Sequence, residues 1–269
     1  MNSKFSSEFI YKIFALLIAV IVVHAAYVGI IRPNADAIFE HQLQMQAEGK
    51  EFVPSRSLHV ILKDYEQETC FILMLWAMAI IGHKARGMML ERALFDQQLI
   101  RVSAGMSILP EDARDYMRPI QALKPPQCDY LLARVLKVSL QRFASTRNIQ
   151  SVSTAIRETC EIEADRLDSE LSMIRYIAWA IPSIGFIGTV RGIGAALGQA
   201  HKAVQGDIAG VTASLGVAFN STFIALVISI IIMFLVYQLQ LTQERLVLDS
   251  QRYCDDHLMH HLQVRGPEG

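Results

Sequence analysis

The sequence of 269 residues predicts an all-α integral membrane protein, with four transmembrane helices and long helical cytoplasmic extensions. Hydrophobic residues make up 52% of the chain and charged residues 19%, below the usual share of about 25%. The apolar residues gather in four blocks without Asp, Glu, Lys or Arg, at 13–31, 69–83, 176–190 and 208–243. Because a helix needs about 20 apolar residues to cross a bilayer, we expect spans near 10–31, 66–83, 176–200 and 208–237.

The first two spans are expected to anchor residues 1–83 as a pair. The first block follows Lys4 and Lys12, so a cleaved signal peptide and a retained anchor are the alternatives. A signal peptide has an apolar core of about 7–15 residues, and the longer run here favours the anchor. The second block is the weakest of the four, and a span there places Glu66 and Glu68 in the outer headgroup layer. Residues 33–64 between these spans are expected to form an external loop.

Positive charge near the span ends predicts the topology, because cytoplasmic ends carry an excess of Lys and Arg. Such residues follow the second span, precede the third and follow the fourth: Lys84, Arg86, Arg92, Arg166, Arg175, Arg245 and Arg252. We therefore expect both termini, and the segment between the second and third spans, to be cytoplasmic.

The charged segment after the second span is predicted to be a cytoplasmic helical region over residues 84–149. Pro110 stands where a helix would begin, and Pro119 is expected to end that helix. A proline pair at 125–126 then separates it from an amphipathic pattern at 129–147.

The third span is predicted to belong to one helix that runs from about 150 to about 200. Small and apolar residues recur there every three or four positions, which is the spacing of one helical face: Val152, Ile156, Cys160, Ala164, Leu167, Leu171, Ile174 and Ala178. The fourth span continues in the opposite direction into a helical tail at 241–269. We therefore expect a long helical hairpin over residues 150–240. The alternative is two soluble helices joined to the spans by bends at the membrane surface.

Small residues form a stripe on each of the last two spans. The stripes are Pro182, Gly185, Thr189, Gly192 and Ala196 on the third span, and Ser214, Ala218, Ser221, Thr222, Ala225 and Ser229 on the fourth. In lipid, small residues let helices pack closely, and hydroxyls hydrogen-bond across the contact. The plain interpretation is packing alone. The polar side chains near mid-membrane, Thr189, Asn220, Ser221 and Thr222, favour an additional role.

These residues also form a paired motif. The pattern P-x-x-G-x-x-G-T-V-x-G in the third span consists of Pro182, Gly185, Gly188, Thr189, Val190 and Gly192, and T-x-x-G/A-L in the fourth consists of Thr222, Ala225 and Leu226. In this order the pair resembles the MotA/TolQ/ExbB ion-channel subunits over residues 150–240. The resemblance implies a homopentamer in the bacterial inner membrane, around two helices of a smaller, single-span MotB/TolR/ExbD-like partner. It implies no enzymatic activity and no cofactor.

The resemblance also implies that a membrane Asp of the partner carries H⁺ or Na⁺ past the threonines. No Asp or Glu lies inside the first, third or fourth predicted span, and an ion path without its own charged group needs one from elsewhere. We expect the hydroxyls of Thr189 and Thr222 to coordinate a cation or to bridge a water molecule. Ser221 and Asn220 are lesser candidates.

Several residues depart from the family pattern. Val217 replaces a Glu of TolQ-like and ExbB-like members, Ile231 replaces a Pro, and Ala225 replaces the usual Gly. The four spans look more like the motility branch, but no rotor-facing charge pattern can be placed in residues 84–128, so the driven process stays open.

Arg191 is unusual, because a charge this deep costs at least about 2.5–3.5 kcal/mol on insertion scales. It lies about 200° around the helix from Thr189, so we expect it to face away from a pore. It would then contact a neighbouring subunit or extend to the outer headgroups.

Other functions find little support in the sequence. The net charge of −1 shows no footprint for nucleic acid, and no nucleotide-binding, zinc-protease or esterase motif is present. The four cysteines form no C-x-x-C motif and are expected to pack. His257 and His261 could bind a metal from one helix face, but a solvated helix end is favoured. The remaining hypotheses are a conducting stator subunit and a non-conducting membrane scaffold or signalling protein.

Overall fold

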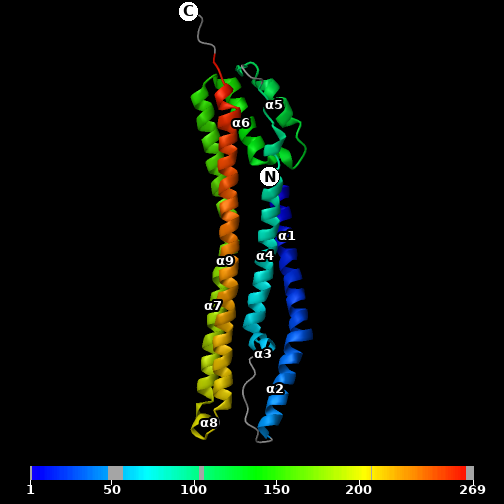
Figure 1. The fold of residues 1–269 in the computed structure, drawn as a ribbon, viewed down its shortest axis with the longest axis vertical. Coiled ribbons are helices and arrows are strands. Elements are labelled where there is room, and N and C mark those ends of the chain that lie inside the picture. The colour runs from blue at the N-terminus through cyan, green and yellow to red at the C-terminus, as the bar shows by residue number, and fades with distance from the viewer. Residues whose placement is uncertain (1, 48–56, 103–105, 207, 265–269) are drawn as a thin grey trace, which may run out of the picture. The chain divides into compact units, whose positions relative to one another are not determined.

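The computed structural model describes residues 2–47, 57–102, 106–206 and 208–264, which form an all-α protein (Figure 1). Its helices are α1 Asn2–Ala26, α2 Arg32–Ala47, α3 Leu58–Leu62, α4 Tyr65–Arg92, α5 Ala113–Gln121, α6 Leu131–Thr146, α7 Ile149–Gly198, α8 Ala200–Val204 and α9 Ala209–His257. A π-helix, η1 Tyr27–Ile31, joins α1 to α2, and short 3-10 helices lie at Phe95–Gln97, Gln127–Asp129 and Met259–His261. No β-strand forms in the described residues, as the sequence predicts.

Among the described residues, four helical stretches are long and apolar enough to cross a membrane, and each overlaps one predicted span. They are Ser7–Ile38, Tyr65–Gln97, Ile149–Gly198 and Ala209–His261. In the apolar window of each stretch only 17–28% of the residues are buried. An apolar exterior of this extent suits hydrocarbon rather than water, so the chain is a multi-pass membrane protein and the predicted fold class is confirmed.

The chain folds into two compact units, each built from two segments of sequence. Unit 1 consists of Met1–Gly82 with Met173–Val236, and unit 2 of His83–Ser172 with Tyr237–Gly269. Helices α4, α7 and α9 each contribute one part to unit 1 and one part to unit 2.

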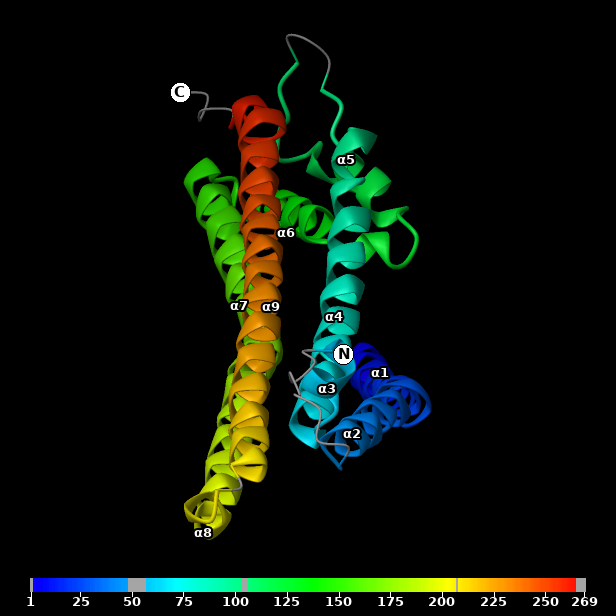
Figure 2. The same ribbon diagram turned by 60° about the horizontal axis from the view of Figure 1, so that its bottom comes forward.

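In unit 1, α1 and α4 lie side by side (Figure 2). The indole nitrogen of Trp76 on α4 donates a hydrogen bond to the carbonyl of Lys12 on α1, at 2.8 Å. In the other direction, the Tyr11 hydroxyl on α1 donates to the carbonyl of Ala79, at 3.1 Å. These two bonds set the register of the first two spans.

The first span does not end near residue 31 as expected, because the helix continues through η1 into α2. Pro33 lacks an amide hydrogen and its ring crowds the carbonyl four residues earlier, that of Gly29. Gly29 lies within η1, where the chain has already left the regular α-helical bonding, so the helix passes the proline unbroken. The segment 33–64 expected as a loop is therefore helical in α2 and α3, while its residues 48–56 lie outside the described part.

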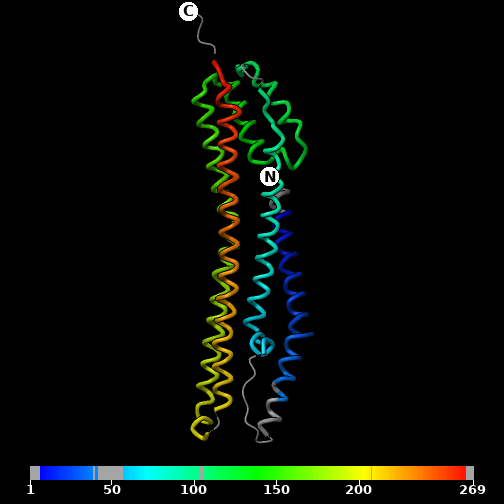
Figure 3. The backbone as a smooth tube through the Cα atoms, in the orientation of Figure 1, coloured from blue at the N-terminus to red at the C-terminus, as the bar shows by residue number. Residues whose placement is uncertain are grey.

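Helices α7 and α9 form a hairpin: in Figure 3 the tube turns back at its yellow end, where α8 joins the two helices. In unit 1 a small-residue seam joins them, made of three pairs: Gly185 with Ala225 (2.5 Å), Gly188 with Ser221 (2.6 Å) and Gly192 with Ala218 (2.8 Å), where each distance joins a Cβ built on the glycine to the facing Cβ. Real Cβ atoms do not approach so closely. The two backbones are therefore in contact, and each of these three positions accepts only glycine.

Pro182 lies inside α7 without ending it. A proline leaves the carbonyl four residues earlier without its helical donor, which here is the carbonyl of Ala178. The Ser229 hydroxyl of α9 donates to this carbonyl at 2.9 Å. One end of the seam thus replaces the hydrogen bond that Pro182 removes.

In unit 2, one face of α6 is buried: Leu131, Leu132, Val135, Leu136, Leu140 and Phe143. The carboxylate of Glu91 on α4 accepts a hydrogen bond from the backbone N–H of Leu131, which satisfies a free donor at the start of α6. The expectation that Pro119 ends a helix is wrong, since α5 continues to Gln121. A proline disturbs the turn before it rather than the residues after it, so two further residues can remain helical.

The chain end also differs from one expectation. Helix α9 ends at His257, and a 3-10 helix follows at Met259–His261, so His257 and His261 do not share an α-helical face. The His257 ring stacks on the Tyr253 ring instead, with centroids 4.2 Å apart. No group of His, Cys, Asp and Glu in the described residues is arranged to hold a metal ion.

The small-residue seam predicts that Gly185→Ala destabilises the hairpin, because the added methyl would meet Ala225 Cβ and the Ser221 carbonyl, which cannot move away independently. We expect a loss of about 1–3 kcal/mol from overpacking, measured by unfolding in detergent. The matched control is Gly194→Ala on the same helix, where a built Cβ meets nothing within 4 Å. Equal stability of the two variants would contradict the seam, and Ala225→Gly should rescue Gly185→Ala.

Candidate functional site

Thr189 of α7 and Thr222 of α9 meet across the small-residue seam. Their hydroxyl oxygens are in direct contact. Each hydroxyl also lies 3.0 Å from a carbonyl of the opposite helix, Thr189 from that of Ala218 and Thr222 from that of Gly185, and the threonine whose proton is not used between the two hydroxyls donates to its carbonyl. The structure thus brings the two main predicted site residues together as a reciprocal brace, and both side chains are half-buried.

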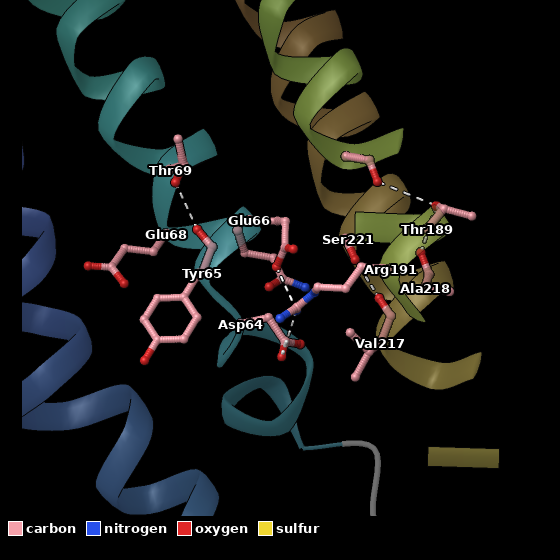
Figure 4. A network of polar contacts seen from close by, with 12 residues as sticks. Asp64, Tyr65, Glu66, Glu68, Thr69, Thr189, Arg191, Val217, Ala218 and Ser221 are labelled. Atoms are coloured by element: carbon pink, nitrogen blue, oxygen red, sulfur yellow. Dashed lines mark hydrogen bonds and ion pairs between the residues drawn. The ribbon is translucent and has the colours of Figure 1, made fainter. Parts of the chain in front are cut away.

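The lesser candidates lie beside this pair without joining it. Ser221 is 1% exposed, and its hydroxyl donates to the Val217 carbonyl on its own helix at 2.5 Å (Figure 4). Asn220 is half-buried on α9, and no hydrogen bond joins its amide to either threonine. Ser221 contributes to packing, since it fills the space over Gly188.

Hydroxyl groups at this place can do limited chemistry. Each has one proton and two lone pairs, so a threonine that donates to a carbonyl can still accept a hydrogen bond or face a cation. The hydroxyls do not titrate near neutral pH, and no carboxylate stands in the charge-free runs of α7 and α9 at residues 176–190 and 208–243. A charged group must therefore come from outside this hairpin.

Arg191 of α7 does not stand alone. Its guanidinium forms an ion pair with Glu66 at 2.8 Å and a second with Asp64 at 3.6 Å (Figure 4). The side chains of Asp64 and Glu66 are 15% and 11% exposed, so both carboxylates are largely withdrawn from solvent. The sequence interpretation of Arg191, as a contact to another subunit or to headgroups, did not include this partner within the chain.

One signal in the sequence points to this pairing. An arginine inside a span needs a counter-charge, and the carboxylates at the start of the second span were the available candidates at the outer end of the spans. The pKa of the Asp64 carboxyl lies above its ordinary value, because the effect of burial is larger than the opposing effect of the nearby Arg191.

A second ionic group uses the other side of α4. Glu68 pairs with Arg32 of α2 and, at 2.7 Å, with His24 of α1. The Arg32 guanidinium also lies 4.4 Å from the centroid of the Tyr65 ring, a cation–π arrangement. This group ties the first span to the second, at a buried carboxylate that is only 8% exposed.

Comparison with known proteins supplies one match. Residues 127–252 match the family described as the MotA/TolQ/ExbB proton channel family. The matched region contains α7, α8 and most of α9, and therefore the whole small-residue seam with Thr189 and Thr222. No curated protein and no solved structure matches the chain.

The ionic group around Glu68 predicts that Glu68→Gln destabilises the protein, because it leaves Arg32 without its counter-charge. We expect a loss of about 1–3 kcal/mol, measured by denaturant unfolding in detergent. The control is Glu8→Gln, which removes the pair with Lys12, where the Glu8 side chain is 33% exposed. Pairs of that kind contribute about 0–1 kcal/mol, so equal losses would contradict the assigned weight of Glu68.

Proposed function

Since residues 127–252 belong to the MotA/TolQ/ExbB proton channel family, a family of channel proteins rather than enzymes, we propose that the chain is the ion-conducting subunit of a stator complex driven by the ion-motive force. The ion is H⁺ or Na⁺. A smaller single-span subunit of the MotB/TolR/ExbD type supplies a membrane Asp, and the ion passes that carboxylate beside the threonine pair. The complex lies in a bacterial inner membrane, with both termini of this chain in the cytoplasm.

The observation that carries this proposal is the contact between Thr189 and Thr222 inside the matched region. Hydroxyl oxygens of two helices at one level offer ligands for a cation or a water molecule, without a fixed charge that would trap it. The charge-free runs around them, at residues 176–190 and 208–243, contain no carboxylate, as expected of a path that borrows one from a partner.

The brace formed by the threonines is compatible with this role. Each hydroxyl has one proton and two lone pairs, and one of the two protons lies in the contact between the threonines. The lone pairs that these contacts leave free on the two oxygens are the groups that can face a cation. The same bonds hold the two oxygens at a constant separation while the ion passes.

The apolar exterior supports an assembly as well as a bilayer. Large side chains remain exposed on both helices of the hairpin, including Phe186 and Ile187 on α7 and Phe219 and Phe223 on α9, each more than 60% exposed. Lipid, further copies of the chain and a partner helix are all suited to cover such surfaces. We propose a homopentamer around two partner helices, in which the threonine level faces the partner.

The proposal predicts that Thr189→Val and Thr222→Val, which keep shape and remove the hydroxyl, each lower ion flux. In proteoliposomes that contain the chain with its co-purifying partner, we expect the double variant to lose at least about tenfold, as for removal of a strong oxygen ligand. Flux is followed with an internal pH dye or a sodium indicator.

Ser229→Ala is the matched control. It removes a hydroxyl bond across the same two helices, to Ala178, but two turns away from Thr222. Wild-type flux in this variant, with low flux in both threonine variants, supports the proposal. Unchanged flux in the threonine variants would contradict the roles assigned to Thr189 and Thr222. A wild-type complex that conducts no ion would favour the non-conducting scaffold.

A further inference from the structure

We propose that Asp64, Glu66 and Arg191 form an arginine clamp that sets the charge beside the ion path. In this clamp the two carboxylates hold and neutralise Arg191, so that its positive charge does not oppose the passage of a cation along the hairpin. The inference rests on the proposed function. It assigns to these three residues the choice between cations and anions at the threonine pair.

The clamp is a built arrangement rather than a chance surface pair. Arg191 reaches one carboxylate oxygen of Glu66 at 2.8 Å and one of Asp64 at 3.6 Å. Both acids stand at the start of α4, with Glu66 in its first turn, where the positive end of the helix dipole favours a negative charge. The two acids are at most 15% exposed, whereas the Arg191 side chain is 48% exposed, so screening acts mainly on the arginine side of the cluster.

The clamp also lies against the helical hairpin. A Cβ built on Gly188 would be 3.2 Å from Glu66 Cγ and 2.6 Å from Ser221 Cβ. The bare surface of Gly188 therefore accepts two side chains at once: Ser221 from α9, which precedes Thr222, and Glu66 from α4. Through this glycine the Glu66 carboxylate comes close to the seam that holds the threonine pair.

The effect of the clamp on a nearby cation depends on whether the guanidinium or the carboxylates are left without a partner. A free guanidinium one turn or less from Thr189 would repel any cation at the threonines. At an effective dielectric constant near 20 and a separation of about 10 Å, one unit charge changes occupancy by roughly tenfold. Paired with two ionised acids, the same guanidinium belongs to a cluster with a net charge of −1, which no longer repels a cation.

The other charges nearby do not take over this role. Lys63 adds a positive charge beside Asp64, so it increases the need for the two acids. Glu68 is engaged by Arg32 and His24 on the α1 and α2 side of α4. Arg191 is therefore compensated by Asp64 and Glu66 themselves.

The test uses the fact that an ion pair can be broken from either side. Asp64→Asn with Glu66→Gln leaves Arg191 uncompensated, whereas Arg191→Gln leaves two carboxylates. A merely structural ion pair predicts similar losses from both changes. The clamp predicts opposite effects: cation flux about a hundredfold lower in the double acid variant, which removes two negative charges, and wild-type or higher flux in Arg191→Gln.

The full chain with its co-purifying partner is reconstituted, and flux is divided by the amount of folded complex measured by size exclusion. Glu66→Gln alone and the triple variant Asp64→Asn, Glu66→Gln, Arg191→Gln each leave the cluster one negative charge short of wild type, so we expect both to lose about tenfold, and the triple variant to recover about tenfold over the double acid variant. Equal losses from the two sides, or no rescue in the triple variant, would overturn the clamp.

The outcome also separates this inference from the proposed function. If wild-type flux is present and depends on Thr189 and Thr222, but the two sides of the clamp behave alike, only the clamp is wrong. If the wild-type complex conducts no ion, the proposed function and the clamp are both overturned.

Discussion

The close approach of α7 and α9 at Gly185, Gly188 and Gly192 is the constraint on which the rest of unit 1 depends. Lipid tails give apolar helices no net reason to associate, so backbone packing and hydrogen bonds must hold them together. Helices with ordinary side chains keep their axes about 8–10 Å apart, too far for a threonine hydroxyl to reach the opposite backbone. Because the three glycines have no side chains, the two helices come closer than this, and the hydroxyls of Thr189 and Thr222 reach the opposite backbone.

The first turn of α4 connects this hairpin to the first span. Glu66 and Glu68 stand two positions apart, about 200° around a helix, so the two carboxylates point to different neighbours. Glu66 pairs with Arg191 of α7, while Glu68 pairs with Arg32 and His24. The acidic first turn of α4, which the sequence places in the headgroup layer, thus binds the first span on one side and the hairpin on the other.

Much of this fold is readable from the sequence, because its main signals are local. Four charge-free blocks predict four spans. The apolar repeat that ends at Ala178 predicts one long helix, which is Ile149–Gly198 in the structure. The contact between Thr189 and Thr222 is also accessible, since a recognised motif orders the two helices. The pairing of Arg191 with Glu66 is only partly accessible: an arginine inside a span calls for a counter-charge, but 125 positions separate the two residues, and nothing local identifies Glu66 as the partner.

The errors have equally physical origins. Pro119 is expected to end a helix, yet a proline acts on the turn that precedes it, and α5 continues to Gln121. His257 and His261 have the spacing of one helical face, but α9 ends at the first of them. Spacing predicts a shared face only where the helix is known to persist.

The π-helix η1 has a consequence for the first span as a whole. Each residue added to a helix turns everything after it by about 100°, and a π-helical segment takes up such an addition without breaking the rod. Helix α2 is therefore in a different rotational phase from α1, although no loop separates them. The residues that share a face in α1 therefore do not continue on the same face in α2. The direction in which Arg32 points is set separately from the membrane-facing side of α1.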